Sequence, residues 1–227
     1  AIETARENKE KAESYLDDVD AELEALAERR DELQTRIGGV RTEIEALESL
    51  RAERDDLLAV HAQSPLSEDQ KRTFTGLRFF DYDPSFRFTP DLDPVPDAAP
   101  YAFDLGQDGS INLLPFARTR GLADALGSEL TLYWIGGYGG GVFLPFADAH
   151  SATYGGGRYL LDGIKGADLG RTDAGSPILD FNFAYNPSCA YNGPEQSTAG
   201  WVCPLAPAEN HLAYPVPVGE QGFYTCT

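Results

Sequence analysis

The 227-residue chain contains no methionine and is poor in histidine and cysteine, with three of each. It carries only 18 basic residues against 37 acidic ones, so its formal net charge is −19. Phosphate recognition needs a cationic surface, and this charge therefore argues against nucleic acid and anionic membranes as partners. We interpret the acidic excess as an adaptation to molar salt, where the screening length falls to about 3 Å, and we expect a halophilic protein.

Long apolar runs are also missing. Because no stretch of about 18 apolar residues occurs, we expect no membrane-spanning segment. Residues 1–16 contain neither an apolar h-region nor a cleavage site, which favours the cytoplasm. An extracellular location is the alternative if the chain is processed. The sequence has no C-x-x-C pair and no EF-hand loop pattern, so we expect no metal and no other cofactor.

Glycine and aromatic residues are scarce in the first 70 residues, which contain two of the 23 glycines and one aromatic, Tyr15. This change in composition, together with Pro65, places a boundary near residues 61–70. The sequence therefore predicts a coiled-coil helical segment over 1–62 and a β-rich domain over 71–227. The expected fold class is α+β, a long coiled-coil helix followed by a mainly antiparallel sandwich or barrel-like sheet.

The first segment follows a heptad pattern. Its a and d positions, in chain order, are Ile2, Ala5, Lys9, Ala12, Leu16, Val19, Leu23, Leu26, Arg30, Leu33, Ile37, Val40, Ile44 and Leu47. Alternating steps of three and four residues over this length predict a coiled coil, and hence a homo-oligomer formed through residues 2–47. The seam fails at Arg51 and Arg54, and we expect the last turns of the helix to pack on the following domain.

Two features of this helix leave its geometry open. Gly38-Gly39 is compatible either with a continuous or kinked helix or with the turn of an antiparallel hairpin. In an in-register parallel dimer, Arg36 would face Arg41 and Glu43 would face Glu48. These like charges disfavour the parallel arrangement.

The second part is rich in short apolar and aromatic runs separated by Gly, Pro and Asp. We predict strands at 77–82, 101–105, 110–116, 129–135, 141–146, 158–163, 177–183 and 212–218. Residues 121–129 are predicted to contain a short helix. The proline-rich stretch 88–101 is predicted to be irregular.

Four motifs occur in an order that resembles the domain-of-unknown-function 1684 family. They are FTGLRFFDYDPSFRF, FLPFADAHSATYGGGRYL, LDFNFAYNPSCAY and CPLAPAENHL, and the resemblance covers roughly residues 48–220. It implies a compact, mostly β domain of the kind found in bacteria and haloarchaea, in keeping with the acidic charge. The family has no activity to carry over, and the resemblance therefore assigns no catalytic residue.

Arg158 and Asp180 both lie inside apolar runs, where an unpaired charge would be unfavourable. We predict that they pair with each other, either as a structural lock or as part of a pocket. Cys189 and Cys203 are open to four interpretations: zinc ligands, which the lack of a C-x-x-C partner disfavours, a disulfide, two free thiols, or a nucleophile at Cys189 with His150 as its base. Cys226 is an odd thiol near the C-terminus.

Our leading interpretation is a binding or assembly protein with no assignable reaction. The alternative is a small-molecule hydrolase with a polar pocket around Arg158, Asp180, Tyr185 and Cys189. A small-molecule ligand is compatible with either. The full set of residues for a candidate pocket or lock is Tyr154, Arg158, Asp180, Asn182, Tyr185, Asn186, Cys189, Cys203, Glu209 and Asn210.

Overall fold

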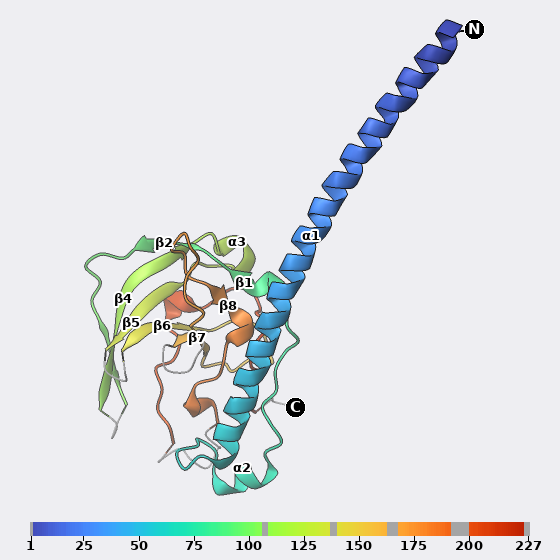
Figure 1. Cartoon of the computed structure of the whole chain (residues 1–227). Helices are drawn as coiled ribbons and strands as arrows, with labels where there is room; N and C mark the ends of the chain where they lie inside the picture. Colours follow the sequence, from blue (N-terminus) through green and yellow to red (C-terminus); the bar gives the residue numbers. More distant parts are fainter. Residues whose placement is uncertain (1, 106–108, 137–139, 163–167, 192–199, 225–227) are drawn as a thin grey trace. The chain divides into compact units, whose positions relative to one another are not determined.

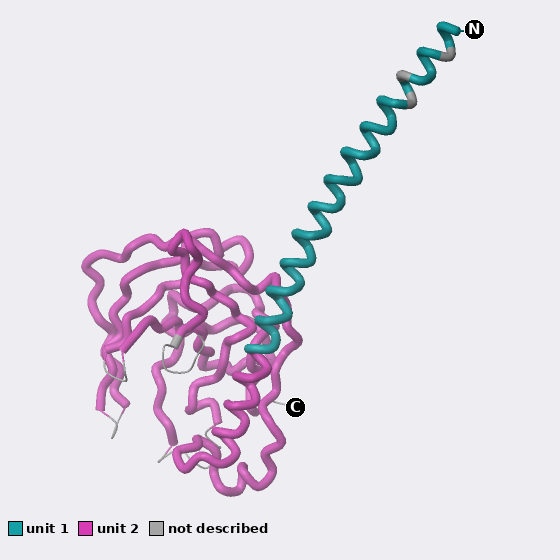
Figure 2. The backbone as a smooth tube through the Cα atoms, viewed as in Figure 1, with its two compact units in different colours: residues 1–46 teal, residues 47–227 magenta. Residues whose placement is uncertain are grey.

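The structure is a computed structural model that describes residues 2–105, 109–136, 140–162, 168–191 and 200–224. The chain divides into two compact units, Ala1–Ala46 and Leu47–Thr227 (Figure 2). The fold class is α+β, because one long helix, α1, is followed by antiparallel sheets (Figure 1).

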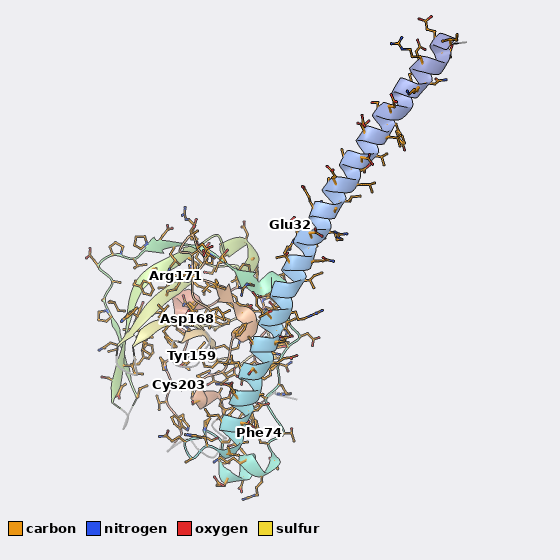
Figure 3. The ribbon with its side chains drawn as sticks, viewed as in Figure 1. Glu32, Phe74, Tyr159, Asp168, Arg171 and Cys203 are labelled. Atoms are coloured by element: carbon orange, nitrogen blue, oxygen red, sulfur yellow. The ribbon has the colours of Figure 1, made fainter. Side chains whose placement is uncertain are left out.

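Helix α1 runs from Ile2 to Val60 without a break, so Gly38 and Gly39 are helical and do not form the turn of a hairpin. The hydroxyl of Thr42 donates to the carbonyl oxygen of Gly38 at 3.2 Å, one turn back along the helix. Apart from the adjacent residues and the helix's own backbone within four residues, no described atom lies within 4 Å of a Cβ placed on either glycine. Packing therefore does not require glycine at these positions. Figure 3 draws the side chains along this helix, with Glu32 labelled.

The C-terminal turns of α1 belong to the second unit and pack on it, as the change in seam predicted. Leu47 and Leu58 are each only 2% exposed. The helix ends at Val60, and α2 (Glu68–Thr73) begins after a capping box in which Ser67 and Gln70 each accept the other's backbone N–H.

The main sheet has six strands, all paired in antiparallel fashion, and it is not closed into a barrel. The long strand β4 pairs with β2 and β3 at its two ends and with β5 along its other edge, and β6 and β7 follow. The strands are β2 (Asp91–Pro94), β3 (Tyr101–Asp104), β4 (Ser110–Arg120), β5 (Thr131–Gly136), β6 (Gly141–Phe146) and β7 (Arg158–Asp162).

Strand β4 shows how the sequence produces this sheet. Its residues alternate between exposed and buried over almost the whole strand, with Ile111, Leu113, Ala117 and Thr119 turned inward. Side chains of a strand point to opposite faces in turn, so this alternation buries one face and leaves the other in solvent. The pairing with β5 shifts register between Pro115 and Ala117, which marks a bulge.

A second, two-stranded sheet pairs β1 (Arg87–Phe88) with β8 (Leu179–Asp180). The strand predicted over 177–183 is thus only two residues long, because a 3-10 turn follows at Phe181–Phe183. The short helix predicted within 121–129 is confirmed as α3 (Ala123–Leu126). The prediction that 88–101 is wholly irregular was wrong, since β2 lies within it.

Two predicted strands are not strands. Residues 77–82 make a single bridge, between Phe79 and Glu220. In residues 212–218, Pro215 and Pro217 have no N–H to donate to a ladder. Isolated backbone bonds hold Leu212 and Tyr214, to the carbonyl oxygens of Ala147 and Leu126. Side chains hold Val216: Asp148 accepts from its N–H at 3.1 Å, and its carbonyl oxygen accepts from Arg158 at 2.9 Å.

Three apolar clusters fill the second unit. The largest lies around Leu126, Leu132, Phe146, Phe181 and Val218. The second cluster is mainly aromatic, and its main members are Leu113, Tyr133, Phe143, Tyr159 and Tyr185. The third cluster joins the end of α1 to the loop before α2 through Leu58, Leu66 and Tyr191.

Candidate functional site

Arg158 is the first residue of β7 and is 1% exposed. Its guanidinium donates to Asp148 Oδ2 at 2.8 Å and to the carbonyl oxygens of Val216, Val218 and Glu220. Burial lowers the pKa of Arg158, and the negative Asp148 opposes that shift. Arg158 therefore ties the C-terminal segment 216–220 to the edge of the sheet. Its Nε has no hydrogen-bond partner among the described residues.

Asp180 is also 1% exposed, but its ionic partner is Arg87, at 3.3 Å. The predicted pair of Arg158 with Asp180 was wrong. Strand β8 pairs with β1, and the register places Arg87 directly across from Asp180. Arg158 instead lies across from Phe146 at the end of β6, two residues before Asp148. Arg158 and Asp180 are each paired with an opposite charge, which compensates for the cost of removing them from water. Each partner lies at or near the end of the neighbouring strand.

Asn182 completes the arrangement at Asp180. Its N–H and Nδ2 donate to Asp180 Oδ1 at 3.0 and 2.8 Å, and its amide group makes two further bonds with the backbone of Asp83. This reciprocal pair of bonds joins the loop before β1 to the 3-10 turn after β8.

A third buried charge lies where α1 meets the C-terminal segment, and sequence reasoning missed it. Glu220 is 0% exposed, and its carboxylate accepts from Arg54 Nε at 3.2 Å. It also accepts from the N–H and the Nδ2 of Asn186 at 3.0 and 2.8 Å, and from the hydroxyl of Tyr191. Arg54 stacks on Tyr185, with 4.7 Å from its guanidinium carbon to the ring centroid. We call these five side chains the Arg54–Glu220 network.

Electrostatics and backbone geometry both hold this network. Burial lowers the pKa of Arg54, but Tyr191 and the carboxylate of Glu220 more than reverse this and raise it overall. Burial raises the pKa of Tyr191 well above its usual value, so its hydroxyl stays protonated. Gly219 has φ +75°, and a Cβ there would lie 2.7 Å from the carbonyl oxygen of Ala184. Only glycine lets the chain approach closely enough to place Glu220.

Signals for the missed residues were weak but present. Arg54 interrupts the apolar stripe of a helix that is otherwise buried at Leu47 and Leu58, and a charge on such a face needs a partner. Asp148 lies two residues after the apolar strand run 141–146. No local sequence pattern around Glu220 indicates that its carboxylate pairs with Arg54, which lies 166 positions earlier in helix α1.

Cys189 and Cys203 lie together as thiols, with no disulfide between them in this structure. The N–H of Cys189 donates to Cys203 Sγ at 3.4 Å, and Tyr154 Oη lies 3.8 Å from Cys189 Sγ. A side-chain hydrogen bond between the Cys189 thiol and Cys203, together with burial, raises the pKa of the Cys189 thiol. Burial raises the pKa of Tyr154 to about 12, so it is no base at neutral pH. Cys226 lies outside the described residues.

Glu209 and Asn210 occupy a 3-10 turn, Ala208–Asn210, and play different parts. Asn210 is 0% exposed and bonds backbone only, with the N–H and carbonyl oxygen of Thr131 and the carbonyl oxygen of Pro145. Glu209 accepts from the hydroxyls of Tyr133 and Tyr101 at 2.7 and 2.8 Å. Burial opposes ionisation of Glu209, but hydrogen bonds to its carboxylate lower its pKa overall.

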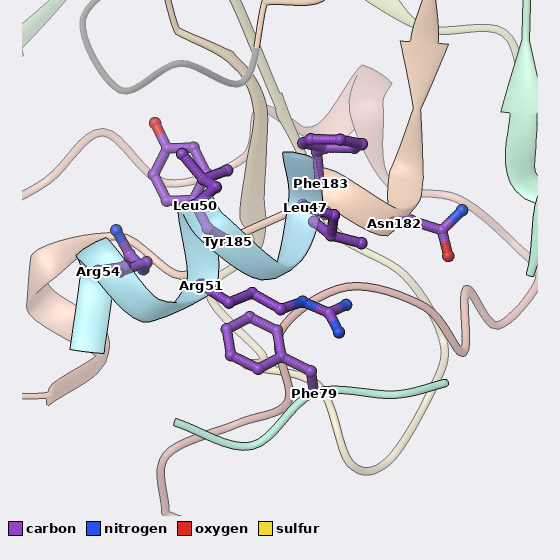
Figure 4. Close-up of a pocket in the computed structure, with 9 residues that line it drawn as sticks. Leu47, Leu50, Arg51, Arg54, Phe79, Asn182, Phe183 and Tyr185 are labelled. Carbon is purple, nitrogen blue, oxygen red and sulfur yellow. The ribbon is translucent and has the colours of Figure 1, made fainter. Parts of the chain in front are cut away.

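Glu209 also lines an open hollow of about 440 Å³ on the sheet. The rest of its wall is mostly apolar, with the polar side chains of Arg118, Tyr101 and Thr131. The apolar lining residues are Val95, Ala98, Ala99, Pro100 and Pro115. This hollow can admit a small molecule, whereas the space beneath α1 cannot. That space, lined by Leu47, Arg51, Phe79 and Asn182 among others, holds about 10 Å³ (Figure 4), roughly the room for one water.

The predicted pocket residues therefore fall into separate places. Asn186 and Tyr185 join Arg54 and Glu220, and Asp180 lies with Asn182. Cys189 contacts Tyr154 and Cys203, and Glu209 lies at the hollow beside Asn210. Within the described ranges, no group of three or more His, Cys, Asp and Glu side chains could hold a metal ion. In the same ranges, no helix is both long and apolar enough to cross a membrane.

These features define a class: a mostly β domain with an open antiparallel sheet, buried ion pairs and a long N-terminal helix. A family model described as a protein of unknown function, DUF1684, matches residues 72–221, more than half of the chain. The chain belongs to this family, as the four motifs predicted.

Two comparisons extend this. The solution NMR structure of an uncharacterized protein from Haloarcula marismortui has a TM-score of 0.54 and 28% sequence identity, over 80% of this chain and 95% of that one. A curated protein of Halobacterium salinarum, the DNA double-strand break repair Rad50 ATPase, is 54% identical over 52 residues. Those residues are 23% of this chain but 6% of that protein. Such a small share carries no activity across.

Proposed function

We propose that this chain is a homo-oligomeric binding or assembly protein, in which the heptad segment of α1 associates the copies and the β-rich domain is the part presented for binding. One observation carries the proposal: six large apolar side chains at a and d positions of this helix are exposed in the single chain. Their exposed fractions are 89% for Ile2, 59% for Leu16, 58% for Leu23, 58% for Leu26, 45% for Leu33 and 59% for Ile37.

An apolar stripe of this kind is unfavourable in water and is the usual mark of an interface. Long isolated helices also gain most of their stability from packing of one face, which here requires a partner. The proposed partner is a second copy, because the seam keeps heptad spacing and is not the wider stripe of a helix on a globular core.

The chemistry of the β-rich domain favours binding over hydrolysis. A cysteine nucleophile needs a lowered thiol pKa and a base, whereas the pKa of Cys189 is raised and its described neighbour Tyr154 stays protonated. Arg158 and Asp180 are each engaged by charged and backbone partners. Binding of a small molecule would use the hollow beside Glu209, where a carboxylate and Arg118 line an apolar wall.

The charge supports a further part of the proposal, which is that the protein works in high salt without nucleic acid as a partner. A net charge of −19 repels phosphate. The similar proteins come from Haloarcula and Halobacterium, organisms named for salt, and this supports the high-salt part of the proposal.

Light scattering on the full chain in molar KCl tests the oligomer. We expect more than one copy per particle, and Leu23→Glu with Leu26→Lys should reduce this to one. The matched control, Ala21→Glu with Thr35→Lys, adds the same two charges at exposed f positions and should leave the oligomer intact. A wild-type chain that stays monomeric at all concentrations refutes the proposal.

A further inference from the structure

We infer that two copies of this chain pair antiparallel along residues 5–44, centred between Glu24 and Ala25. The inference rests on the proposed function, since it assumes that α1 self-associates, and it adds the orientation and register. Its basis is the continuous helix through Gly38-Gly39, which keeps one heptad phase over both halves. Because the helix is continuous, each charged residue at an e or g position has a defined location beside the a and d positions of the seam.

The seam itself argues against the parallel alternative. In a parallel in-register dimer, each a position faces its own copy, so Lys9 would face Lys9 and Arg30 would face Arg30. Two like charges buried opposite each other are unfavourable. In the antiparallel register, a positions face d positions instead. Lys9 then lies opposite Val40 of the partner copy and Arg30 opposite its Val19, so both can extend their charges past a short side chain into solvent.

The central layers of this register are well matched. Leu16 faces Leu33 of the partner copy, and Leu23 faces its Leu26. All four side chains are between 45% and 59% exposed in the single chain, so formation of the dimer can bury them. Leu47 is 2% exposed because it packs within its own second unit, and the seam therefore ends at Ile44.

The flanking charges select this register. In an antiparallel pair, e positions lie beside e positions and g beside g, and side chains lean toward their own N-termini. Arg6 then meets the partner copy's Glu48, and Glu13 meets its Arg41. On the other side, Glu22 meets Arg29. Each contact occurs twice by symmetry, each joins opposite charges, and no flanking pair in this register joins like charges.

A shift by one heptad in either direction replaces attraction with repulsion. In one direction, Arg6 meets Arg41 and Glu22 meets its own copy. In the other, Glu13 meets Glu48 and Arg29 meets its own copy. Charge pairs at flanking positions are the feature that sets orientation and register in coiled coils. All six charged residues of the proposed contacts are exposed along the helix.

A charge reversal tests the contact nearest the centre. Arg29→Glu should weaken the dimer about tenfold at low ionic strength, because two attractive contacts with Glu22 become repulsive. Adding Glu22→Arg to that variant should restore the affinity. In a parallel dimer the neighbours of these positions are Gln34 and Ala27, and neither change should matter.

Arg36→Glu is the matched control. Arg29 and Arg36 are both g positions, and both lie within one turn of Glu32, so the two reversals disturb the helix itself alike. In the antiparallel register, residue 36 faces Tyr15, and the affinity should hardly change. In a parallel dimer it faces Arg41, and the reversal should tighten the dimer. That tightening, or a failure of Glu22→Arg to rescue Arg29→Glu, would overturn the inference.

Distances between spin labels test the orientation independently. Labels are attached to Thr42→Cys or to Ala21→Cys in a chain whose three native cysteines are replaced by alanine. Thr42 lies opposite Glu7 of the partner copy, so its two labels are about 52 Å apart along the axis, whereas those at Ala21 are about 10 Å apart. In a parallel dimer both pairs lie side by side.

The outcomes separate the two proposals. A long distance at residue 42 with a short one at residue 21 supports the antiparallel dimer. Short distances at both positions, or more than two copies by light scattering, overturn the orientation but leave self-association standing. The absence of any defined distance together with a monomer by light scattering overturns both.

Discussion

Removing the carboxylate of Glu220 is the sharpest test of what holds the second unit together. Glu220→Ala deletes the acceptor of four hydrogen bonds, from Arg54, twice from Asn186, and from Tyr191. The Arg54 side chain is 18% exposed and cannot recover full hydration in place. Losing one member of a buried ion pair destabilises by about 3–5 kcal/mol, and each donor left unpaired adds to this by up to about 1–3 kcal/mol.

Because these terms overlap, we expect a total of about 4 kcal/mol, which for a domain of this size lowers Tm by about 8–16 °C. Urea unfolding in molar KCl, followed by near-ultraviolet circular dichroism, is the assay. That signal reports the aromatic packing of the second unit and is insensitive to the helix of the first. Arg54→Met with Glu220→Gln should be less destabilised than Glu220→Ala, because it removes the cation and keeps an acceptor for Asn186.

Asp91→Ala is the matched control. It breaks the Arg120–Asp91 pair, whose side chains are 63% and 67% exposed, and should change the free energy of unfolding by less than about 1 kcal/mol. If Glu220→Ala destabilises no more than Asp91→Ala, the Arg54–Glu220 network does not hold α1 to the domain, and our account of this interface is refuted.

Three further predictions concern charge, redox state and salt. Hydrogen bonds from three backbone N–H groups and Thr119 outweigh burial and lower the pKa of Glu129. The contribution of the Glu129 carboxylate to the free energy of unfolding should be complete above about pH 4.3 and vanish as the pH falls through the folded pKa. Glu129→Gln should therefore be less stable than wild type at pH 7 and equal to it at low pH. Equal stability at pH 7 contradicts this. Oxidation by a disulfide reagent should join Cys189 to Cys203 with loss of two hydrogens, seen by peptide mass spectrometry; an unlinked pair after full oxidation speaks against their contact. Finally, Tm should rise steeply with KCl, because salt screens repulsion among the acidic residues; a flat profile contradicts the halophilic interpretation.

The sequence alone determined the features that depend on local pattern. The step of three and four residues from Ile2 to Leu47 predicted the helix, because residues at that spacing share one face. Strand β4 was partly predicted, over 110–116, since its alternation of apolar and polar residues requires a half-buried strand. The requirement that Arg158 and Asp180 be paired also followed from sequence, because a lone charge inside an apolar run is too unfavourable to remain.

Tertiary structure decided which partners these residues have. Asp180 meets Arg87 through the pairing of β8 with β1, and Glu220 meets Arg54 across 166 positions of sequence. Register between distant segments depends on the packing of the whole core, and no local pattern encodes it. The same holds for residues 212–218, which look like a strand. Pro215 and Pro217 cannot join a ladder, and the buried Arg158 and Asp148 supply hydrogen bonds to Val216 between them.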